Sequence, residues 1–554
     1  MSASEGSPIA WSHLQQRALD AVIQGRRNVF LTGGGGVGKS RLIQEFRLRA
    51  EAAGRSVVVA ALTGIAAINI GGITLHSFLK MGPDEMDKKS PQEIAADRAK
   101  NPYFAKSVRK LSMLIIDEVS MMEPRMLHVA NSILMRTRDS SEPFGGLQVV
   151  LVGDFFQLPP VSSTLYSDSN SSDALALVPP LKARPRFIFQ TELFFHLVHE
   201  MIELAEAWRQ PDPAFASMLG RMRRQALSPE DIDVLQSRLD ADITTGDGIL
   251  PTQLSAKNVQ VDAKNAAHLE ALKGTPVSYK VRNGAWASKP SSSRRASSGG
   301  GGGSGSGGGC GSGGDGKDKA IEFIRDKLLK DLNMTAPLTL KIGAQVMLIT
   351  NFDVARGLVN GSRGVVVGFS KAVGDVPAAT KKPSRPDDES IFSQRTLEEP
   401  YAYPDEPMPI VQFSGTGEAV GPKMQVPYYR WTRETPGLGT AYVWNVPLRL
   451  AWSSTVHKSQ GLSLNKTDIC LDSSVFEEGQ AYVAVSRVRT LEGLRFSAFD
   501  PRVIRANPDV LQFYSYNYDI QRAAVLEAVR ARLLVGDAAK TLPLKRARDD
   551  NDEA

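Results

Sequence analysis

The chain has 554 residues, enough for more than one domain with its own hydrophobic core. Its 66 basic and 60 acidic residues give a net charge of +6, a mild excess that permits a polyanionic partner without requiring one. No apolar run approaches the roughly 18 residues that predict a membrane span, so we expect no membrane partner. The two cysteines, Cys310 and Cys470, lie far apart and predict a reducing compartment rather than a disulfide framework.

A phosphate-binding loop lies near the amino terminus. The pattern G-x-x-x-x-G-K-[ST] is matched by Gly33, Gly34, Gly35, Gly36, Val37, Gly38, Lys39 and Ser40. An apolar run precedes the loop and a helical pattern follows it, which is the strand–loop–helix context that the motif requires. Lys39 would reach the β- and γ-phosphates of ATP, and Ser40 would place its hydroxyl on magnesium. The alternative is a glycine-rich turn without a ligand.

Apolar strands separated by helical stretches recur between residues 28 and 161. Three of them, Val57–Ala60, Leu114–Ile116 and Val149–Val152, have the pattern of buried parallel strands. The fold class that this alternation predicts is α/β with a largely parallel sheet. Ligands of such sheets bind at the carboxyl ends of the strands.

Two polar motifs directly follow predicted strands. Asp117 and Glu118 come after the second of these strands, where Asp117 would bind magnesium and Glu118 would polarise the attacking water. Gln157, in the segment Gly153–Pro160, could sense the γ-phosphate. Each has an alternative, because acidic pairs are common on surfaces and a loop with two prolines also simply ends a strand.

Two arginines, Arg209 and Arg487, are candidates for contacts with the γ-phosphate. A planar guanidinium suits the charge that develops there during phosphoryl transfer. Arginine is abundant in this chain, so a surface salt bridge is the alternative for each.

The second half of the chain contains two low-complexity stretches. Residues 291–316 are almost wholly Gly and Ser, which predicts a disordered loop spanning roughly 28 Å. Residues 371–409 are rich in Pro and charge and predict a second long loop. Short strand patterns and the turn signal Asn360-Gly361 predict a small β-rich module near residues 340–445.

Several further segments carry a family resemblance. They are Thr63–Ala67, Gly72–Phe78, Asp117–Met121, Glu123–Gly146, Gly153–Pro160, Trp208–Gln210, Leu450–Gly461 and Gln480–Arg487. With the phosphate loop, they resemble the petite-integration-frequency family of DNA helicases, which belongs to superfamily 1B and is akin to RecD. The resemblance covers most of residues 11–500 apart from the two long loops. The chain departs modestly from the family pattern, with Gly-Gly-Val at Gly35–Val37 where Ala-Gly-Thr is usual.

The resemblance implies two RecA-like P-loop domains with parallel sheets and ATP in the cleft between them. A small accessory wedge would belong to the first domain and an SH3-like β insertion to the second. The expected boundaries are 1–185 for the first domain with its wedge at about 79–110, 186–345 and 446–510 for the second domain, 346–445 for the insertion, and 511–554 for a C-terminal helix and charged tail.

The resemblance also assigns residues. It makes Arg209 and Arg487 γ-phosphate contacts supplied by the second domain, and Gln15 the residue that reads adenine. Its further assignments are Gln460 and Gly461 at the ATP site, and His76, Ser77, Phe78, Thr455, His457 and Lys458 at the DNA strand. Without the resemblance, the two histidines would fit buried, hydrogen-bonded positions and Phe78 would fit a core position equally well.

The function that the resemblance implies is an ATP-dependent helicase that moves 5′ to 3′ on single-stranded DNA and unwinds duplex or structured DNA in replication, repair, recombination or telomere maintenance. We expect a monomer with Mg²⁺ as cofactor, single-stranded and forked DNA as partners, and replication or telomere proteins as further partners. The expected location is the nucleus, with the mitochondrion as alternative; Lys545–Arg548 fits an import signal or a solvated tail. A P-loop switch or kinase, or a DNA-binding remodeller that does not unwind, are the rival functions.

Overall fold

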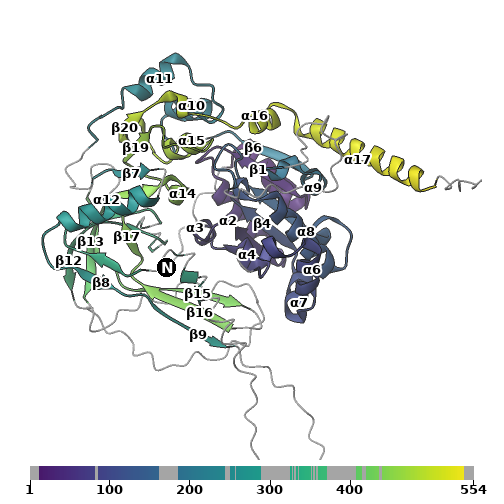
Figure 1. The fold of residues 1–554 in the computed structure, drawn as a ribbon, viewed down its shortest axis with the longest axis horizontal. Helices are drawn as coiled ribbons and strands as arrows, with labels where there is room; N and C mark the ends of the chain where they lie inside the picture. The colour runs from purple at the N-terminus through teal and green to yellow at the C-terminus, as the bar shows by residue number, and fades with distance from the viewer. Residues whose placement is uncertain are drawn as a thin grey trace, which may run out of the picture.

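The computed structural model describes residues 11–81, 85–160, 185–206, 208–243, 250–255, 258–287, 336–350, 360–370, 407–414, 420–435 and 439–541, with shorter pieces between 325 and 358. This part of the chain forms two parallel sheets, the helices that accompany them and an antiparallel β region (Figure 1). The Gly/Ser stretch 291–316, residues 371–406 of the second predicted loop and the basic cluster 545–548 lie outside the described residues.

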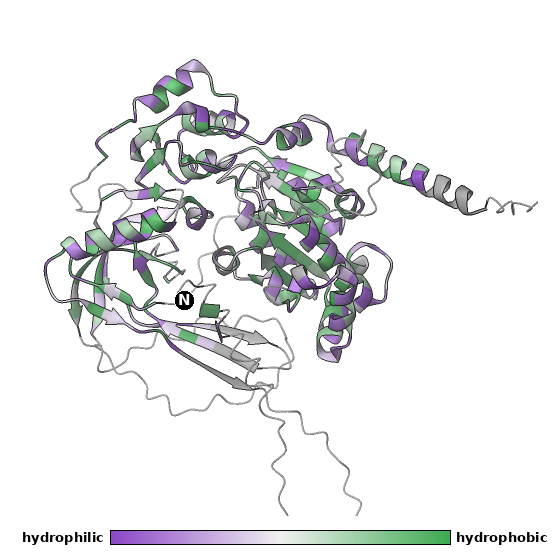
Figure 2. Ribbon diagram, in the orientation of Figure 1, coloured by the Kyte–Doolittle hydropathy of each residue, from purple (hydrophilic) through white to green (hydrophobic). Residues whose placement is uncertain are grey.

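The first sheet has six parallel strands in the order β3-β2-β4-β5-β1-β6. They are β1 (Val29–Gly33), β2 (Val57–Ala61), β3 (Ile73–Thr74), β4 (Met113–Asp117), β5 (Gln148–Val152) and β6 (Glu200–Leu204). All residues of β1, β2, β4 and β5 are buried, as unbroken apolar runs predict for strands covered on both faces. Figure 2 shows these hydrophobic strands at the centre of what we call the first domain. The predicted α/β architecture is confirmed.

Helices cover both faces of the first sheet. They are α1 (His13–Leu19), α2 (Lys39–Ala52), α3 (Gly64–Asn69), α4 (Leu75–Phe78), α8 (Pro124–Arg138) and α9 (Glu192–Leu197). The stretch in which we expect the wedge contains α5 (Glu85–Lys88), α6 (Pro91–Ala99) and α7 (Pro102–Lys110), and α6 packs along α8. A reciprocal capping box between Ser90 and Glu93 starts α6.

The first sheet continues past residue 185, where we expected the first domain to end. Strand β6 pairs in parallel with β1, from Val29 opposite Glu200 to Gly33 opposite Leu204. It is an edge strand in which buried and half-buried residues alternate. Its apolar signal is therefore weaker than that of the central strands, and the expected boundary at residue 185 falls before this last strand of the sheet.

The second domain is built on a four-stranded parallel sheet in the order β18-β7-β19-β20. Its strands are β7 (Thr252–Ser255), β18 (Ser453–Thr455), β19 (Thr467–Leu471) and β20 (Leu494–Phe499). Its helices are α10 (Pro213–Arg223), α11 (Pro229–Gln236), α12 (Asn258–Ala271), α14 (Val456–Ser459) and α15 (Gln480–Val485). The sequence separates β7 from β18 by almost 200 residues, and the antiparallel β region fills much of that interval.

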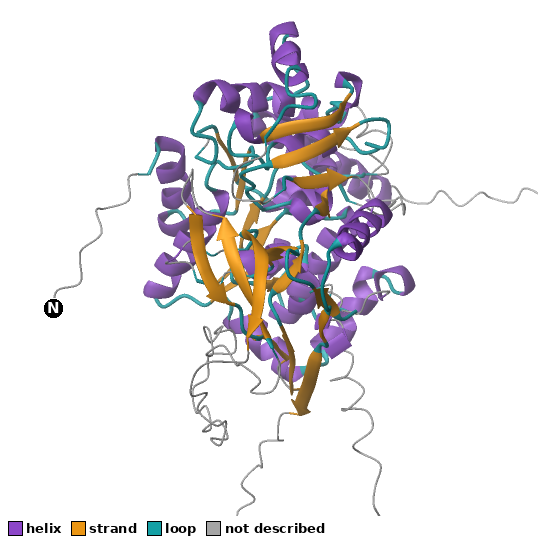
Figure 3. Cartoon of the chain, turned by 90° about the vertical axis from the view of Figure 1, so that its left-hand side faces the viewer, coloured by secondary structure: helices purple, strands orange, loops and turns teal. Residues whose placement is uncertain are grey.

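The predicted β-rich module near residues 340–445 and the strands β8 and β9 that precede it form antiparallel sheets, which Figure 3 shows in a view turned by 90° from Figure 1. One sheet has the order β14-β13-β12-β11-β17, a second has the order β15-β16-β9, and β10 pairs with β8. The strands are β8 (Val277–Tyr279), β9 (Arg282–Ala287), β10 (Leu338–Leu340), β11 (Gln345–Leu348), β12 (Arg363–Ser370), β13 (Met408–Ser414), β14 (Val420–Gln425), β15 (Tyr429–Thr435), β16 (Gly439–Asn445) and β17 (Leu448–Leu450). The five-stranded sheet has its own hydrophobic core, to which Val346, Val411 and Trp452 belong.

The end of the chain returns to the first domain. Helices α16 (Pro508–Ser515) and α17 (Tyr518–Thr541) follow the second sheet in sequence, yet Phe513 stacks on Phe189 and Tyr518 on Phe195 within the first core. The chain therefore crosses between the domains twice, and α17 then extends away from the body of the molecule (Figure 1). In the described part of the chain, no helix combines the length and apolarity needed to cross a membrane.

Candidate ATP and DNA site

The phosphate-binding loop joins β1 to α2 at the carboxyl edge of the first sheet. Gly36 and Gly38 adopt φ values of 87° and 91°, a left-handed backbone that glycine reaches without a steric penalty. Lys39 donates hydrogen bonds from Nζ to the carbonyl oxygens of Gly33 (2.7 Å) and Gly34 (2.8 Å). Burial lowers the pKa of Lys39, while Asp154, Glu118 and Asp117 act in the opposite direction. The lysine is thus held inside the turn that would surround the phosphates.

The predicted acidic pair lies at the end of β4. Asp117 is 7% exposed, and its Oδ1 accepts the backbone N–H of Glu118 across 2.8 Å. Burial, and then the charge of Glu118, raise the pKa of Asp117 to about 7. Glu118 has a left-handed backbone (φ 56°, ψ 40°), which is uncommon for residues other than glycine and often marks a functional position. The surrounding structure therefore holds the backbone of Glu118 in a conformation that costs free energy.

The chemistry of these groups fits magnesium. Asp117 and Ser40 offer carboxylate and hydroxyl oxygens, the hard donors that Mg²⁺ prefers. Among the described residues, no group of three or more His, Cys, Asp and Glu side chains could hold a metal ion. Mg²⁺ is commonly held by one or two protein oxygens together with substrate phosphates, and the donor set here matches that arrangement.

Side chains of the second domain reach the phosphate-binding loop. Tyr482 accepts the backbone N–H of Gly35 at its Oη, across 2.8 Å. A Cβ atom built on Gly35 would lie 3.1 Å from Nη1 of Arg209 and 3.3 Å from Nη2 of Arg487. Beside the loop, a cavity of about 330 Å³ opens, and Gly34, Gly35, Arg223 and Tyr482 are among the residues that line it. The structure thus brings together both predicted arginines and the loop.

Neither arginine has the environment of a surface salt bridge. Arg487 is 2% exposed, and it donates to the carbonyl oxygen of Val483 (2.8 Å) and the hydroxyl of Ser486 (2.9 Å). Arg209 donates to the carbonyl oxygen of Ser486 (3.1 Å), and burial, followed by the charge of Arg487, lowers its pKa to about 9. Within the described residues, neither guanidinium forms an ion pair, so no carboxylate neutralises either charge before an anionic ligand binds.

Gln15, the residue that the resemblance links to adenine, and the ring of Trp208 both lie next to Gly38 of the phosphate-binding loop. Gln15 donates from Nε2 to the carbonyl oxygen of Val37 (3.4 Å) and caps α1 through Ser12. Trp208 donates its backbone N–H to Gly36 O (2.9 Å), and its side chain is 60% exposed. Trp208 was not among the predicted site residues, although it directly precedes the predicted Arg209 in the sequence.

The predicted sensing loop is tied to the second domain. Gln157 donates from Nε2 to Oδ2 of Asp154 (3.3 Å), and Arg223 of α10 forms a buried ion pair with Oδ1 of Asp154 (2.8 Å). Arg223 also binds Glu203 across 2.7 Å. Neither Asp154 nor Arg223 stands out in the sequence by motif or spacing, and their role is visible only in this contact between distant residues.

The predicted DNA residues occupy matching positions in the two domains. Thr74 ends β3 and caps α4 by accepting the N–H of Ser77 (3.2 Å), while Thr455 ends β18 and caps α14 by accepting the N–H of Lys458 (3.3 Å). His76 and His457 are the second residues of these two helices. His76, Ser77, His457 and Lys458 are half-buried, so they keep polar atoms at the surface.

Two predicted DNA residues are placed differently. Phe78 is 3% exposed and belongs to the first hydrophobic core, so its ring has no free face for stacking on a base. The core alternative is therefore the correct one for Phe78. Thr455 is also buried, and its hydroxyl is used to cap α14, which makes it a support for His457 and Lys458. Gly461, predicted at the ATP site, follows Gln460 with a left-handed φ of 81°.

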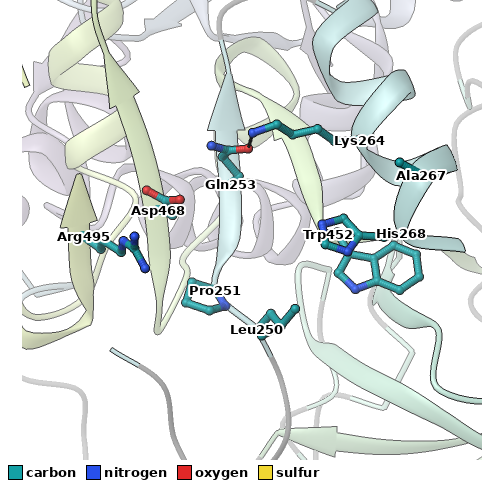
Figure 4. Close-up of a pocket in the computed structure, with 9 residues that line it drawn as sticks. All are labelled: Leu250, Pro251, Gln253, Lys264, Ala267, His268, Trp452, Asp468 and Arg495. Carbon is teal, nitrogen blue, oxygen red and sulfur yellow. Dashed lines mark hydrogen bonds between the residues drawn. The ribbon is translucent and has the colours of Figure 1, made fainter. Parts of the chain in front are cut away.

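A second cavity, of about 320 Å³, lies at the amino-terminal ends of the strands of the second sheet (Figure 4). Side chains of α12 and Trp452 line one side of it, and Asp468 and Arg495 line the other. It contains none of the residues predicted for ATP or DNA. This cavity therefore forms no part of the candidate site.

Comparisons with known proteins agree with this fold. The family models for the PIF1-like helicase and for the DNA helicase Pif1, 2B domain, match residues 12–176 and 329–369. The chain is 34% identical to the ATP-dependent DNA helicase PIF1 of Xenopus laevis over 90% of its own length, and spans 63% of that protein. The Pif1 helicase from Candida albicans has a TM-score of 0.64 at 28% identity and covers 92% of this chain and 99% of its own. Bacteroides Pif1 bound to ssDNA has a TM-score of 0.53 at 25% identity and covers 92% of this chain and 97% of its own. The chain belongs to the PIF1-like helicase family.

Proposed function

We propose that this chain is an ATP-dependent DNA helicase that moves 5′ to 3′ on single-stranded DNA. The observation that carries the proposal is the meeting of the two domains at one phosphate-binding loop. Tyr482, Arg209 and Arg487 contact or approach Gly35 from outside the first sheet. Binding and cleavage of a γ-phosphate there would change the contacts between the domains, which is what a motor requires.

The roles within the ATPase reaction follow from chemistry and position. Lys39, Arg209 and Arg487 bind the γ-phosphate and stabilise the charge that develops on it. Glu118 orients and polarises the attacking water, and Gln157 responds to the presence of the γ-phosphate. Asp117 and Ser40 would hold magnesium, which neutralises charge on the β- and γ-phosphates when bound.

Nucleotide selection rests on two further groups. Gln15 presents its side-chain amide at Val37, next to the phosphate loop. The exposed ring of Trp208 offers a stacking surface for the adenine base beside it. The backbone hydrogen bond between Trp208 and Gly36 holds this residue beside the phosphate-binding loop.

The DNA strand would lie over the two matching helix starts. His76 and Ser77 contact it from the first domain, and His457 and Lys458 contact it from the second. Support comes from their equivalent caps at the ends of β3 and β18, and from the relative from Bacteroides whose structure is described as bound to ssDNA. A change in the distance between the domains would then move the strand by a small step.

The remaining expectations complete the proposal. Helices α5–α7 act as the wedge that splits a duplex, and the antiparallel β region forms the insertion of the second domain. The polarity, the monomeric state and the use of forked DNA rest on the family resemblance. The same is true of a role in replication, repair, recombination or telomere maintenance in the nucleus, with the mitochondrion as the alternative.

The decisive experiment measures ATP turnover with and without single-stranded DNA, together with unwinding of 5′-tailed and 3′-tailed duplexes. We expect strong stimulation by DNA and unwinding of the 5′-tailed duplex alone. ATP turnover that is the same with and without DNA, together with no unwinding, would instead identify a P-loop switch or kinase. Stimulated turnover without strand separation would identify a remodeller.

A further inference from the structure

Helix α16 inserts one side chain behind the ATP site. The helix lies between α10 and α15 of the second domain and the first domain, where the chain makes its second crossing (Figure 1). Its Tyr514 shares a hydrogen bond of 2.5 Å with the hydroxyl of Thr32. Thr32 is fully buried and directly precedes Gly33, the first residue of the phosphate-binding loop. Helix α16 thus reaches the base of that loop.

The ring of Tyr514 contacts two other elements of the site. Its centroid lies 4.8 Å from that of Phe156, which belongs to the sensing loop. The guanidinium carbon of Arg223 lies 5.2 Å from the Tyr514 centroid and 4.6 Å from the Phe156 centroid. These distances are within the range of cation–π contacts, so both rings hold the guanidinium in place.

Arg223 connects this contact to the sensing residue. Its Nε and Nη2 donate to the carboxylate of Asp154 across 2.8 to 3.1 Å. The Oδ2 atom of the same carboxylate also accepts a hydrogen bond from Nε2 of Gln157. Burial lowers the pKa of Arg223, but the charge and hydrogen bonds of Asp154 outweigh this effect and raise the pKa above its ordinary value. A charged pair that is so completely buried depends strongly on the geometry of its neighbours.

We propose that Tyr514 is a positioning residue of the ATPase cycle, which holds Arg223 and the end of β1 in register so that the Gln157 loop can transmit the state of the nucleotide to the second domain. This inference rests on the proposed helicase function. The hydroxyl and the ring have separate tasks. The hydroxyl positions the base of the phosphate loop, and the ring positions the Asp154–Arg223 pair that joins the domains.

The test compares three tyrosines of one short segment by measuring kcat and KM for ATP in the presence of oligothymidylate. Tyr514→Leu removes both the ring and the hydroxyl, so we expect kcat to fall about tenfold because coupling is lost, and KM to rise by about three- to tenfold because the hydrogen bond to Thr32 is lost as well. Tyr514→Phe keeps the ring and loses one hydrogen bond, so KM should rise by about three- to tenfold while kcat is largely restored.

The neighbouring tyrosines are matched controls. Tyr516 is 56% exposed, and Tyr516→Phe should change neither constant. Tyr518 donates its hydroxyl to the carbonyl oxygen of Val198 (3.0 Å) in the core, so Tyr518→Phe should lower Tm without altering kcat or KM. If Tyr518→Phe reproduced the loss of kcat seen with Tyr514→Leu, the effect would be one of general stability, and the proposal would be overturned.

A double-mutant cycle tests the hydrogen bond even if the Tyr514→Leu variant does not fold. Thr32→Val removes the partner hydroxyl, and the double variant with Tyr514→Phe should be no worse than either single variant. Additive effects would refute the hydrogen-bond part of the proposal. A DNA-stimulated wild type with an unchanged Tyr514→Leu variant would overturn this inference alone. A wild type without DNA stimulation would overturn the proposed function, and this inference with it.

Discussion

Gln460 donates a hydrogen bond from Nε2 to Oε2 of Glu118 across 2.8 Å, so an amide of the second domain orients a carboxylate of the first. The two residues are separated by 342 positions in the sequence. Glu118 also has a left-handed backbone, and its orientation therefore depends on both its own strand end and the opposite domain. Separation of the domains would break this bond and leave the carboxylate without its amide partner.

Replacing Gln460 with alanine should lower the DNA-stimulated kcat by about tenfold, because the carboxylate loses a donor that fixes its direction toward water. KM for ATP should change much less than kcat. Steady-state kinetics with saturating oligothymidylate measures both constants. A variant with the kcat of wild type would show that this hydrogen bond is not used during turnover.

Lys39→Ala should abolish ATP hydrolysis, because the ammonium that Gly33 and Gly34 hold inside the loop is then missing. Phosphate release from ATP measures the effect. Lys273 is exposed and remote from the loop in sequence, so Lys273→Ala serves as a charge-matched control that should retain full turnover. An active Lys39→Ala variant would refute the assignment of the nucleotide site.

Arg487→Ala should retain much of the ATP binding but lose turnover by about a thousandfold or more, as expected for an arginine that acts on the transition state. Arg489 is exposed two residues further along, and Arg489→Ala should behave like wild type. Because Arg487 is buried, Tm is measured beside the affinity for a fluorescent ATP analogue and kcat. Turnover that survives in a folded Arg487→Ala protein would contradict the proposed role.

The raised pKa of Asp117 predicts a pH dependence of stability in the metal-free protein. With a folded pKa of about 7 and an unfolded pKa of about 3.9, the folded state holds a proton that the unfolded state has lost between these values. The free energy of unfolding contributed by this group should therefore fall as the pH rises from about 4 to about 7. Urea unfolding across this range, compared with Asp117→Asn, isolates the contribution.

The same proton competes with magnesium. Binding of Mg²⁺ requires the ionised carboxylate, so Mg²⁺ with ADP should raise Tm more at pH 8 than at pH 6. Asp117→Asn should lose both this increment and its pH dependence. An equal increment at the two pH values in the wild type would show that Asp117 is not a ligand.

Lys458→Ala should weaken binding of single-stranded DNA and lower the magnitude of the salt dependence by about 0.7 in the logarithmic slope, the value expected for one lost phosphate contact. Fluorescence anisotropy with labelled oligothymidylate at several salt concentrations measures the slope. The control Lys273→Ala should leave it unchanged. An unaltered slope in Lys458→Ala would remove this residue from the DNA path.

Sequence alone determined the parts of this protein that depend on local pattern. Buried strands such as β4 and β5 appear as unbroken apolar runs, and the phosphate loop needs its glycines in a set order, so both were predictable from a few adjacent residues. Edge strand β6 was missed because two of its five residues are only partly buried. Phe78 was open to two interpretations, since an aromatic residue after a strand suits either a core or a base.

Only the tertiary structure decided which distant side chains meet. Tyr482 forms a hydrogen bond with Gly35, which lies 447 positions away in the sequence, and Tyr514 forms one with Thr32, which lies 482 positions away. Arg223 joins the two domains because it forms a buried ion pair with Asp154 of the first domain. Such contacts arise from the packing of the domains and of α16, which no short sequence pattern encodes. The chemistry of the loop is thus local in sequence, whereas the coupling between domains that would turn it into motion exists only in the folded chain.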